Sequence, residues 1–177
     1  MYSFNRGVKM SSYKYFLILP ILLIATSCVS YGPIKEQGFK SILSKDINVN
    51  TDDLVFTTKG RLTWNIDGFS MQQIGKAKDI ERRGIIVISK DNVHFAEWKD
   101  NSYKEIWKVS YKTISAVELK SFGLNRLVVT RYELDGKPMT GSVTALDDSL
   151  FEIDAETNEK ICNLIANNSK TTCSKDG

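Results

Sequence analysis

Apolar and polar residues alternate along most of the chain after residue 53, and this alternation predicts a mainly β protein. A period of two is the pattern of strands with one buried face. The segments that show it are 54–58, 61–66, 84–89, 94–98, 103–109, 113–119, 126–134 and 139–146, with a short one at 150–153. Lys59-Gly60 predicts a hairpin between the first two segments. Asp135-Gly136 predicts a second hairpin, because its glycine accepts a positive φ. Residues 67–83 show no period and are expected to be a long connection.

One amphipathic helix is predicted near the C-terminus. Asp154 is a suitable N-cap, and the acidic residues that follow it, Glu156 and Glu159, favour the positive end of a helix dipole. Three apolar residues then fall on one face at helical spacing: Ile161, Leu164 and Ile165. The helix is expected to end at residues 167–169. Consecutive antiparallel strands with one such helix predict a bent sheet or partial barrel, with the helix covering an open end.

The first 27 residues have the layout of a secretory signal. The basic residues are Arg6, Lys9 and Lys14, and no acidic residue precedes Cys28. An apolar run, 15–25, follows, and small residues then lead to the cysteine. The run is shorter than the roughly 20 apolar residues that cross a bilayer. Pro20 in its middle further disfavours a spanning helix.

Residues 25–27, Ala-Thr-Ser, and the Cys28 that follows them resemble the bacterial lipoprotein signal. In that family the thiol takes a diacylglycerol, the peptide is cut before the cysteine, and the new amine is usually acylated. The resemblance implies that Cys28 is the first mature residue and carries a stable lipid anchor, since two or more acyl chains hold a protein firmly. The residue after the cysteine is Val29 and not aspartate, and this resembles lipoproteins that are sent to the outer membrane. The alternatives are a plain signal peptide with a chance cysteine, and a translation start at Met10.

The net positive charge of the chain equals the charge of its signal segment. The formal net charge is +3, with 24 basic and 21 acidic residues, and three basic residues lie in the signal. The mature chain is therefore formally neutral, which gives no support for nucleic-acid binding. The length suits one domain. We expect a signal peptide at 1–27, a lipidated cysteine and tether at 28–53, a β domain at 54–168 and a tail at 169–177.

Two cysteines remain once Cys28 is lipidated. Cys162 and Cys173 would lie in an oxidising compartment, where disulfides persist. A bridge between them would hold the C-terminal tail against the last helix. The alternative is that Cys162 is buried in the core while Cys173 frays with the polar tail.

Four segments together resemble the pleckstrin-homology-like (PH-like) fold, and within it the GRAM and bacterial PH-like modules. The segments are GIIVISKDNVHFAEW (84–98), VSYKTISAVEL (109–119), RLVVTRYELDGK (126–137) and AETNEKICNLI (155–165). The resemblance covers about residues 83–166 and implies that Phe95 points inward. The strands before Gly84 depart from the family pattern. The second expectation is a small lipocalin-like barrel with a larger interior.

The sequence contains none of the common catalytic motifs: no Gly-rich phosphate loop, CxxC, HExxH or GxSxG. We therefore expect a chain that is not an enzyme and that holds no cofactor and no metal. The single histidine, His94, alternates with Ala96 and Trp98 and is interpreted as structural. The candidate ligand-binding residues are basic: Arg82, Arg83, Lys120, Arg126 and Arg131. The alternative is a solvated set balanced by acidic neighbours such as Glu81 and Glu118.

These observations predict a non-enzymatic, lipid-anchored binding module that faces the periplasm from the outer membrane. Its partner would be an envelope protein or a lipid headgroup, and not a nucleic acid. The alternative is a lipocalin-like carrier that holds a small apolar ligand in its interior.

Overall fold

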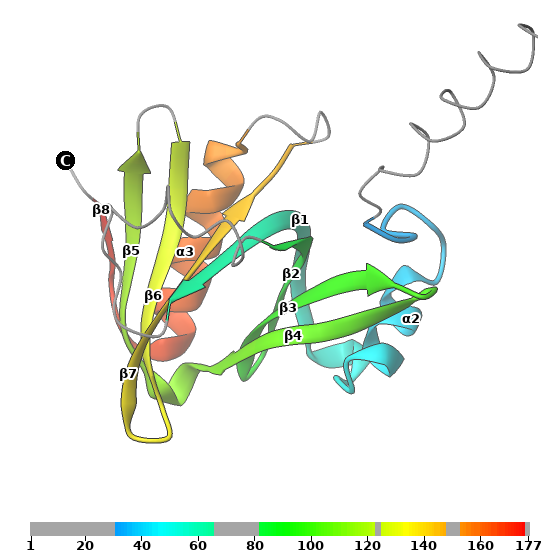
Figure 1. The fold of residues 1–177 in the computed structure, drawn as a ribbon, viewed down its shortest axis with the longest axis horizontal. Helices are drawn as coiled ribbons and strands as arrows, with labels where there is room; N and C mark the ends of the chain where they lie inside the picture. Colours follow the sequence, from blue (N-terminus) through cyan, green and yellow to red (C-terminus); the bar gives the residue numbers. More distant parts are fainter. Residues whose placement is uncertain (1–30, 66–81, 123–124, 148–152, 176–177) are drawn as a thin grey trace, which may run out of the picture.

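The computed structural model describes residues 31–65, 82–122, 125–147 and 153–175 of the 177-residue chain. Two α-helices and eight strands lie in these ranges (Figure 1). The helices are α2 (Phe39–Asp46) and α3 (Ala155–Ser169). The strands are β1 (Leu54–Asn65), β2 (Arg82–Ser89), β3 (Asn92–Lys99), β4 (Ser102–Ser110), β5 (Ile114–Phe122), β6 (Asn125–Leu134), β7 (Lys137–Ala145) and β8 (Cys173–Lys175).

All eight strands form one sheet in the order β4-β3-β2-β1-β7-β6-β5-β8. Neighbouring strands are antiparallel except β5 and β8, which pair in parallel. β4 and β8 are the edges, so the described strands form an open, bent sheet with α3 against β5, β6 and β7. The predicted fold class, a mainly β bent sheet with a C-terminal amphipathic helix, is confirmed.

The two faces of the sheet support two separate hydrophobic cores. The first lies between α3 and the inner face, and includes Leu62, Ile86, Phe95, Trp107, Val128, Val143, Ile161 and Ile165. The second lies between α2 and the outer face of β2, β3 and β4, and includes Phe39, Leu43, Ile85, Val87 and Tyr103. β2 serves both cores, because successive side chains of a strand point to opposite faces. The unbroken apolar run of residues 84–89 follows from this double burial.

The hairpin predicted at Lys59-Gly60 is wrong, because residues 54–65 form one continuous strand, β1. Gly60 lies in its middle, opposite Gly84 on β2 and Ala145 on β7. A Cβ added at Gly60 would overlap the Ile86 side chain and lie 2.8 Å from the carbonyl oxygen of Thr144. The glycine therefore permits a close approach of neighbouring strands instead of a turn.

The hairpin predicted at Asp135-Gly136 is confirmed, and it joins β6 to β7. Both residues have positive φ, 51° and 74°. This is the backbone of the two-residue turn that matches the twist of antiparallel strands.

The prediction of a single helix is incomplete, since α2 also forms. It begins after Gly38, whose φ is +89°, and it packs Phe39 and Leu43 into the second core. Its eight residues are too few to produce a clear helical period in the sequence. Residues 31–53, which the sequence analysis placed with the tether, therefore contribute to the packed domain.

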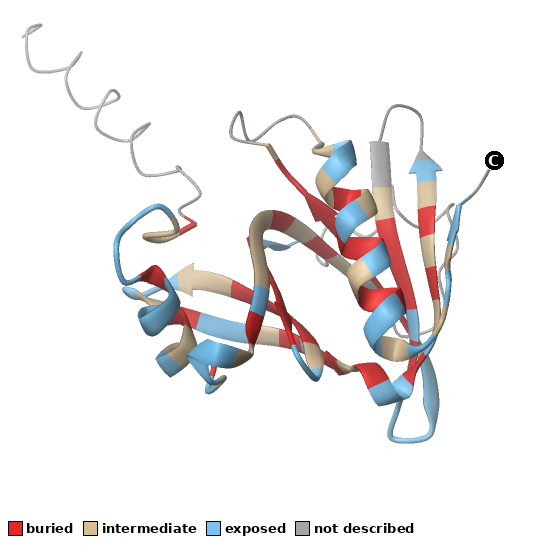
Figure 2. Cartoon of the chain, turned by 180° about the vertical axis from the view of Figure 1, so that it is seen from behind, coloured by how far each residue is buried: buried red, intermediate tan, exposed pale blue. Residues whose placement is uncertain are grey.

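Helix α3 has the predicted boundaries and the predicted cap. The Asp154 side chain accepts a hydrogen bond from the backbone N–H of Thr157 at 2.8 Å. The helix ends at Ser169, and Lys170 follows in the left-handed conformation. The buried Asn158 joins the helix to the sheet, because its Oδ1 accepts a hydrogen bond from the N–H of Ala145 at 2.8 Å. Figure 2 shows the alternation of buried and exposed turns along α3.

Three predictions concern residues outside the described ranges. They are the signal with Cys28, most of the connection at 67–83, and residues 150–152 of the last short strand. At the edges of these gaps, Arg82 and Arg83 belong to β2, and Ile153 forms an isolated bridge to Leu146.

Candidate functional site

The candidate basic residues do not converge on one point. Arg82 and Arg83 follow each other in β2 and so point to opposite faces of the sheet. The Nε of Arg82 lies 3.8 Å from Oε1 of Glu97, while Arg83 lies opposite Arg61 of β1. Two strands, β1 and β7, separate β2 from β6. At the usual strand spacing this is about 14 Å along the sheet.

Lys120 and Arg131 are brought together by a shared carboxylate. Nζ of Lys120 lies 3.1 Å from Oε2 of Glu118, and Nη2 of Arg131 lies 2.9 Å from Oε1 of the same side chain. The Glu118 side chain is 15% exposed and that of Arg131 is 54% exposed. Two cations thus surround one carboxylate on the outer face of β5 and β6, and the exposed Glu133 of β6 lies two positions beyond Arg131. Arg126 lies opposite Ser121 in the pairing of β5 with β6, and its side chain is not among those described.

His94 is fully buried and both of its ring nitrogens have a partner. Nδ1 lies 2.5 Å from Oε1 of Glu105, and Nε2 lies 3.0 Å from the Ser89 hydroxyl. Burial lowers the pKa of His94, an effect that the hydrogen bond to Glu105 partly offsets. A neutral ring that donates from Nδ1 to the carboxylate can only accept at Nε2, where the Ser89 hydroxyl is shared with the carbonyl oxygen of Asn92, 3.0 Å away.

A serine, a histidine and a carboxylate in this order also occur in hydrolytic triads. Ser89 is only 3% exposed, however, so a substrate cannot reach its hydroxyl in this structure. The hydroxyl oxygen also accepts a hydrogen bond from the N–H of Asn92 at 3.1 Å, which holds it in the turn after β2. The arrangement therefore acts as a buried polar link between β2, β3 and β4. The sequence did not single out Ser89 and Glu105, because they reach His94 only through the pairing of β3 with β2 and with β4.

The inner face of the sheet is filled by side chains. Leu62, Ile86 and Phe95 are each 0% exposed, and Trp107 is 8% exposed. Trp107 also packs against Gly141, where an added Cβ would lie 2.8 Å from the indole Cζ2. The space that an apolar-ligand carrier needs is occupied by this first core.

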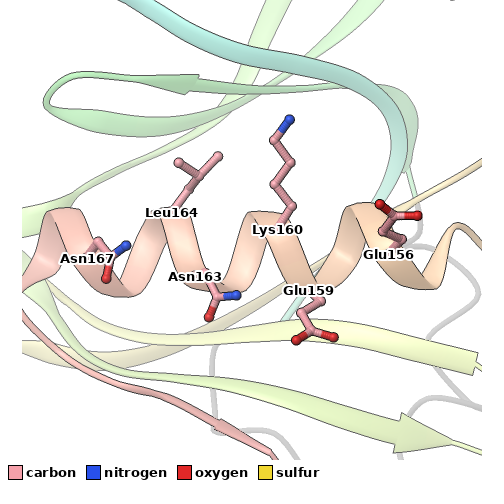
Figure 3. Close-up of a pocket in the computed structure, with 6 residues that line it drawn as sticks. All are labelled: Glu156, Glu159, Lys160, Asn163, Leu164 and Asn167. Atoms are coloured by element: carbon pink, nitrogen blue, oxygen red, sulfur yellow. The ribbon is translucent and has the colours of Figure 1, made fainter.

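A hollow of about 380 Å³ lies along α3 (Figure 3). Its lining residues are Glu156, Glu159, Lys160, Asn163, Leu164 and Asn167. Lys160 and Leu164 point to the same side of the helix, and Nζ of Lys160 lies 4.4 Å from the centroid of the Phe56 ring. The lining combines charged and amide groups with apolar side-chain surface, and the hollow is open to solvent.

The chain immediately after the signal region is fixed to the second core. Tyr31 is 6% exposed, and its carbonyl oxygen accepts a hydrogen bond from the hydroxyl of Tyr103 at 3.0 Å. Gly32, at a φ of +71°, lies so close to Trp98 that an added Cβ would be 2.7 Å from the indole ring. No local pattern in the sequence announces this attachment, since Tyr103 is 72 residues away from Tyr31 along the chain.

The predicted disulfide is confirmed. Cys162 of α3 and Cys173 of β8 are bonded, with their Cα atoms 5.6 Å apart. β8 pairs with β5 through Cys173 and Val117, so the tail is held both by the bridge and by the sheet.

Neither a membrane-spanning helix nor a metal-binding cluster is found among the described residues. None of their helices is long and apolar enough to cross a membrane. No group of three or more histidine, cysteine, aspartate or glutamate side chains among them is arranged to hold a metal ion.

Comparison with known proteins gives likenesses in structure only. No family model matches the chain, and no curated protein matches its sequence. The hSac2 domain from the human phosphoinositide phosphatase Sac2 is similar at 11% identity and a TM-score of 0.45, over 94% of this chain and 92% of that one. The complex of human RhoA with the DH/PH fragment of PDZRHOGEF contains a chain similar at 14% identity and a TM-score of 0.42, over 67% of this chain and 29% of that one. The DH/PH domains of p115-RhoGEF are similar at 13% identity and a TM-score of 0.45, over 73% of this chain and 35% of that one. The chain thus spans about a third of the length of these two DH/PH-containing chains.

One of these similarities corrects the prediction that the chain is not an enzyme. A domain of a protein named as a phosphoinositide phosphatase is among the similar structures. The exclusion rested on missing motifs alone, and a motif search covers only the chemistries whose signatures it contains. The prediction is therefore withdrawn.

Proposed function

We propose that this chain is a lipid-anchored domain that faces the periplasm from the outer membrane and binds an envelope protein or a lipid headgroup. The observation that carries the proposal is Cys28 itself, which follows a basic segment, an apolar run and three small residues. This is where a bacterial lipoprotein carries its acyl chains. The folded domain includes Tyr31, three positions after that cysteine.

The outer face of β5 and β6 is the proposed binding surface. Lys120 and Arg131 share one carboxylate, that of Glu118, and the guanidinium of Arg131 is half exposed. A guanidinium held in this way presents its remaining N–H groups to an anionic partner, such as a phosphate or a carboxylate. The basic residues on β2, Arg82 and Arg83, point to opposite faces of the sheet and are not part of this proposed site.

The anchor is tested by replacing Cys28 with serine in cells. We expect Cys28→Ser to leave the membrane fraction and to lack the mass of the acyl chains, because serine cannot form the thioether. Cys28→Ser protein that still extracts with outer-membrane lipoproteins would refute the anchor.

The binding surface is tested by photocrosslinking in intact cells from a residue beside the site, Ser115. We expect the crosslinked partner to be lost in Arg131→Glu, because this change reverses the half-exposed charge. Arg83→Glu, an exposed change on β2, is the matched control and should keep the crosslink. Equal crosslinking in both variants would show that the partner binds elsewhere.

A further inference from the structure

The chain is docked on the domain from its first described residue. The hydroxyl of Tyr103 donates to the carbonyl oxygen of Tyr31 in a buried hydrogen bond of 3.0 Å, and Nζ of Lys59 lies 5.9 Å from the centroid of the Tyr31 ring. Burial raises the pKa of Tyr103, so the phenol stays protonated and keeps donating. The point where the chain leaves the domain is therefore fixed.

Tyr103 also connects this exit point to α2 and to the β3–β4 hairpin. Its ring packs edge-to-face on Phe39 at 5.8 Å and on Trp98 at 4.8 Å between centroids. Its backbone N–H donates to Oδ2 of Asp46, at the end of α2, at 2.7 Å. Tyr31, α2 and the hairpin thus form one packed unit, which we call the exit end of the domain.

Tyr31 lies only three positions after Cys28, with two residues between them. An extended chain spans at most about 3.5 Å per residue, so the lipidated cysteine would lie within roughly 10 Å of the exit end. A free tether from residue 28 to residue 53 would instead reach about 90 Å by the same measure. The length of the connection between lipid and domain decides whether the domain can reorient above the membrane.

The exit end presents exposed lysines to solvent. They are Lys40 and Lys45 of α2, and Lys99 and Lys104 of the hairpin. Acidic residues lie among them: Glu36, Asp100 and Glu105 are exposed, and Asp46 and Glu97 are half-exposed. Lysines near an anionic membrane surface are attracted to it, and Ile42 of α2 adds an exposed apolar side chain.

We infer that the leaflet that holds the Cys28 lipid is also the docking surface for the exit end, so that the domain stands in one orientation. This inference rests on the proposed lipid anchor. The exit end faces the membrane, while β8 and the β6–β7 turn point away from it. Figures 1 and 2 both place α2 and β8 at opposite ends of the domain. The surface of Lys120 and Arg131 on β5 and β6 then stays available to a partner.

The orientation is measured on the full lipidated protein in vesicles of phosphatidylethanolamine and phosphatidylglycerol. A fluorophore is placed on a single new thiol, either in Lys99→Cys at the exit end or in Lys137→Cys at the β6–β7 turn. Both variants lose one exposed lysine, and the native cysteines are occupied by the lipid and the disulfide. With a quencher on the lipid headgroups, we expect several-fold stronger quenching of the label at residue 99.

A spacer of glycine and serine inserted between Ser30 and Tyr31 lengthens the connection without touching the folded domain. We expect it to reduce the difference between the two labels. Equal quenching at both sites in the protein without the spacer, or a difference that the spacer leaves unchanged, would overturn the inference. Failure of the anchor gives another result, because the protein would then not sediment with the vesicles and Cys28 would carry no lipid mass.

Discussion

The indole N–H of Trp107 donates a hydrogen bond of 3.0 Å to the hydroxyl of Tyr132, and both side chains are buried in the first core. Trp107 belongs to β4 and Tyr132 to β6, and four strands separate them in the order of the sheet. The sheet must therefore curve until these two residues meet across its inner face. Their rings pack edge-to-face with centroids 6.0 Å apart. This pair is a direct tie that holds the curvature.

We expect this tie to contribute to stability as a coupled pair. Tyr132→Phe removes the acceptor and leaves the buried indole N–H without its partner, which should cost about 1–3 kcal/mol. Trp107→Phe should cost at least as much, because it also removes buried ring atoms. Urea unfolding of both single variants and the double variant measures the coupling. Strict additivity would show that the hydrogen bond contributes nothing.

The Cys162–Cys173 bridge should stabilise the domain by restricting the unfolded chain. The two cysteines are separated by 11 residues, a loop length for which the expected loss on removal is about 3 kcal/mol. Cys162→Ala with Cys173→Ser is compared with the parent in urea, with and without reductant. We expect the parent to lose stability on reduction and the double variant to be insensitive. A reductant effect of equal size in both would contradict this assignment.

Gly60→Ala should be strongly destabilising. The added methyl would meet Ile86 and the backbone of Thr144, so neighbouring strands would have to move apart at a cost of about 1–3 kcal/mol. Gly136→Ala is the matched control, because nothing lies within 4 Å of its added Cβ and only the positive φ is unfavourable. Thermal unfolding of the two variants makes the comparison. A larger loss for Gly136→Ala would mean that Gly60 has room after all.

Stability should fall on acidification through His94. Burial lowers the pKa of this histidine in the folded state below its ordinary value of 6.5. The unfolded state therefore takes up the proton first, and the stability contributed above pH 6.5 is lost as the pH falls towards the folded-state pKa. Urea unfolding at about pH 7.5 and about pH 5 tests this linkage, with His94→Gln as the variant that cannot titrate there.

Carboxylates elsewhere in the protein also take up protons as the pH falls. The informative quantity is therefore the difference in pH-dependent stability between the parent and His94→Gln. Glu105 and Lys108 are the charged groups that act on the imidazole. A parent protein whose stability depends on pH no more steeply than that of His94→Gln would contradict the prediction.

Several features of the domain were readable from local sequence patterns. The alternation within β4 and the run at 84–89 follow from which faces of the sheet are buried. The cap at Asp154 and the turn at Asp135-Gly136 depend on residues only a few positions apart. The disulfide was predicted from the cysteine count, on the expectation that Cys28 carries a lipid and that the other two thiols lie in an oxidising compartment. In each case the interaction is local, or the number of possible partners is small.

The remaining features depend on which distant segments meet, and only the tertiary structure decided them. Lys59-Gly60 has the composition of a turn, yet pairing with β2 and β7 keeps β1 continuous through it. The basic residues looked like one group along the chain, but the strand order places Arg82 and Arg131 on separate surfaces. The docking of Tyr31 requires Tyr103, which lies 72 residues further on. Such contacts are set by strand order and sheet curvature, and these arise from the packing of all the strands together, so no single segment encodes them.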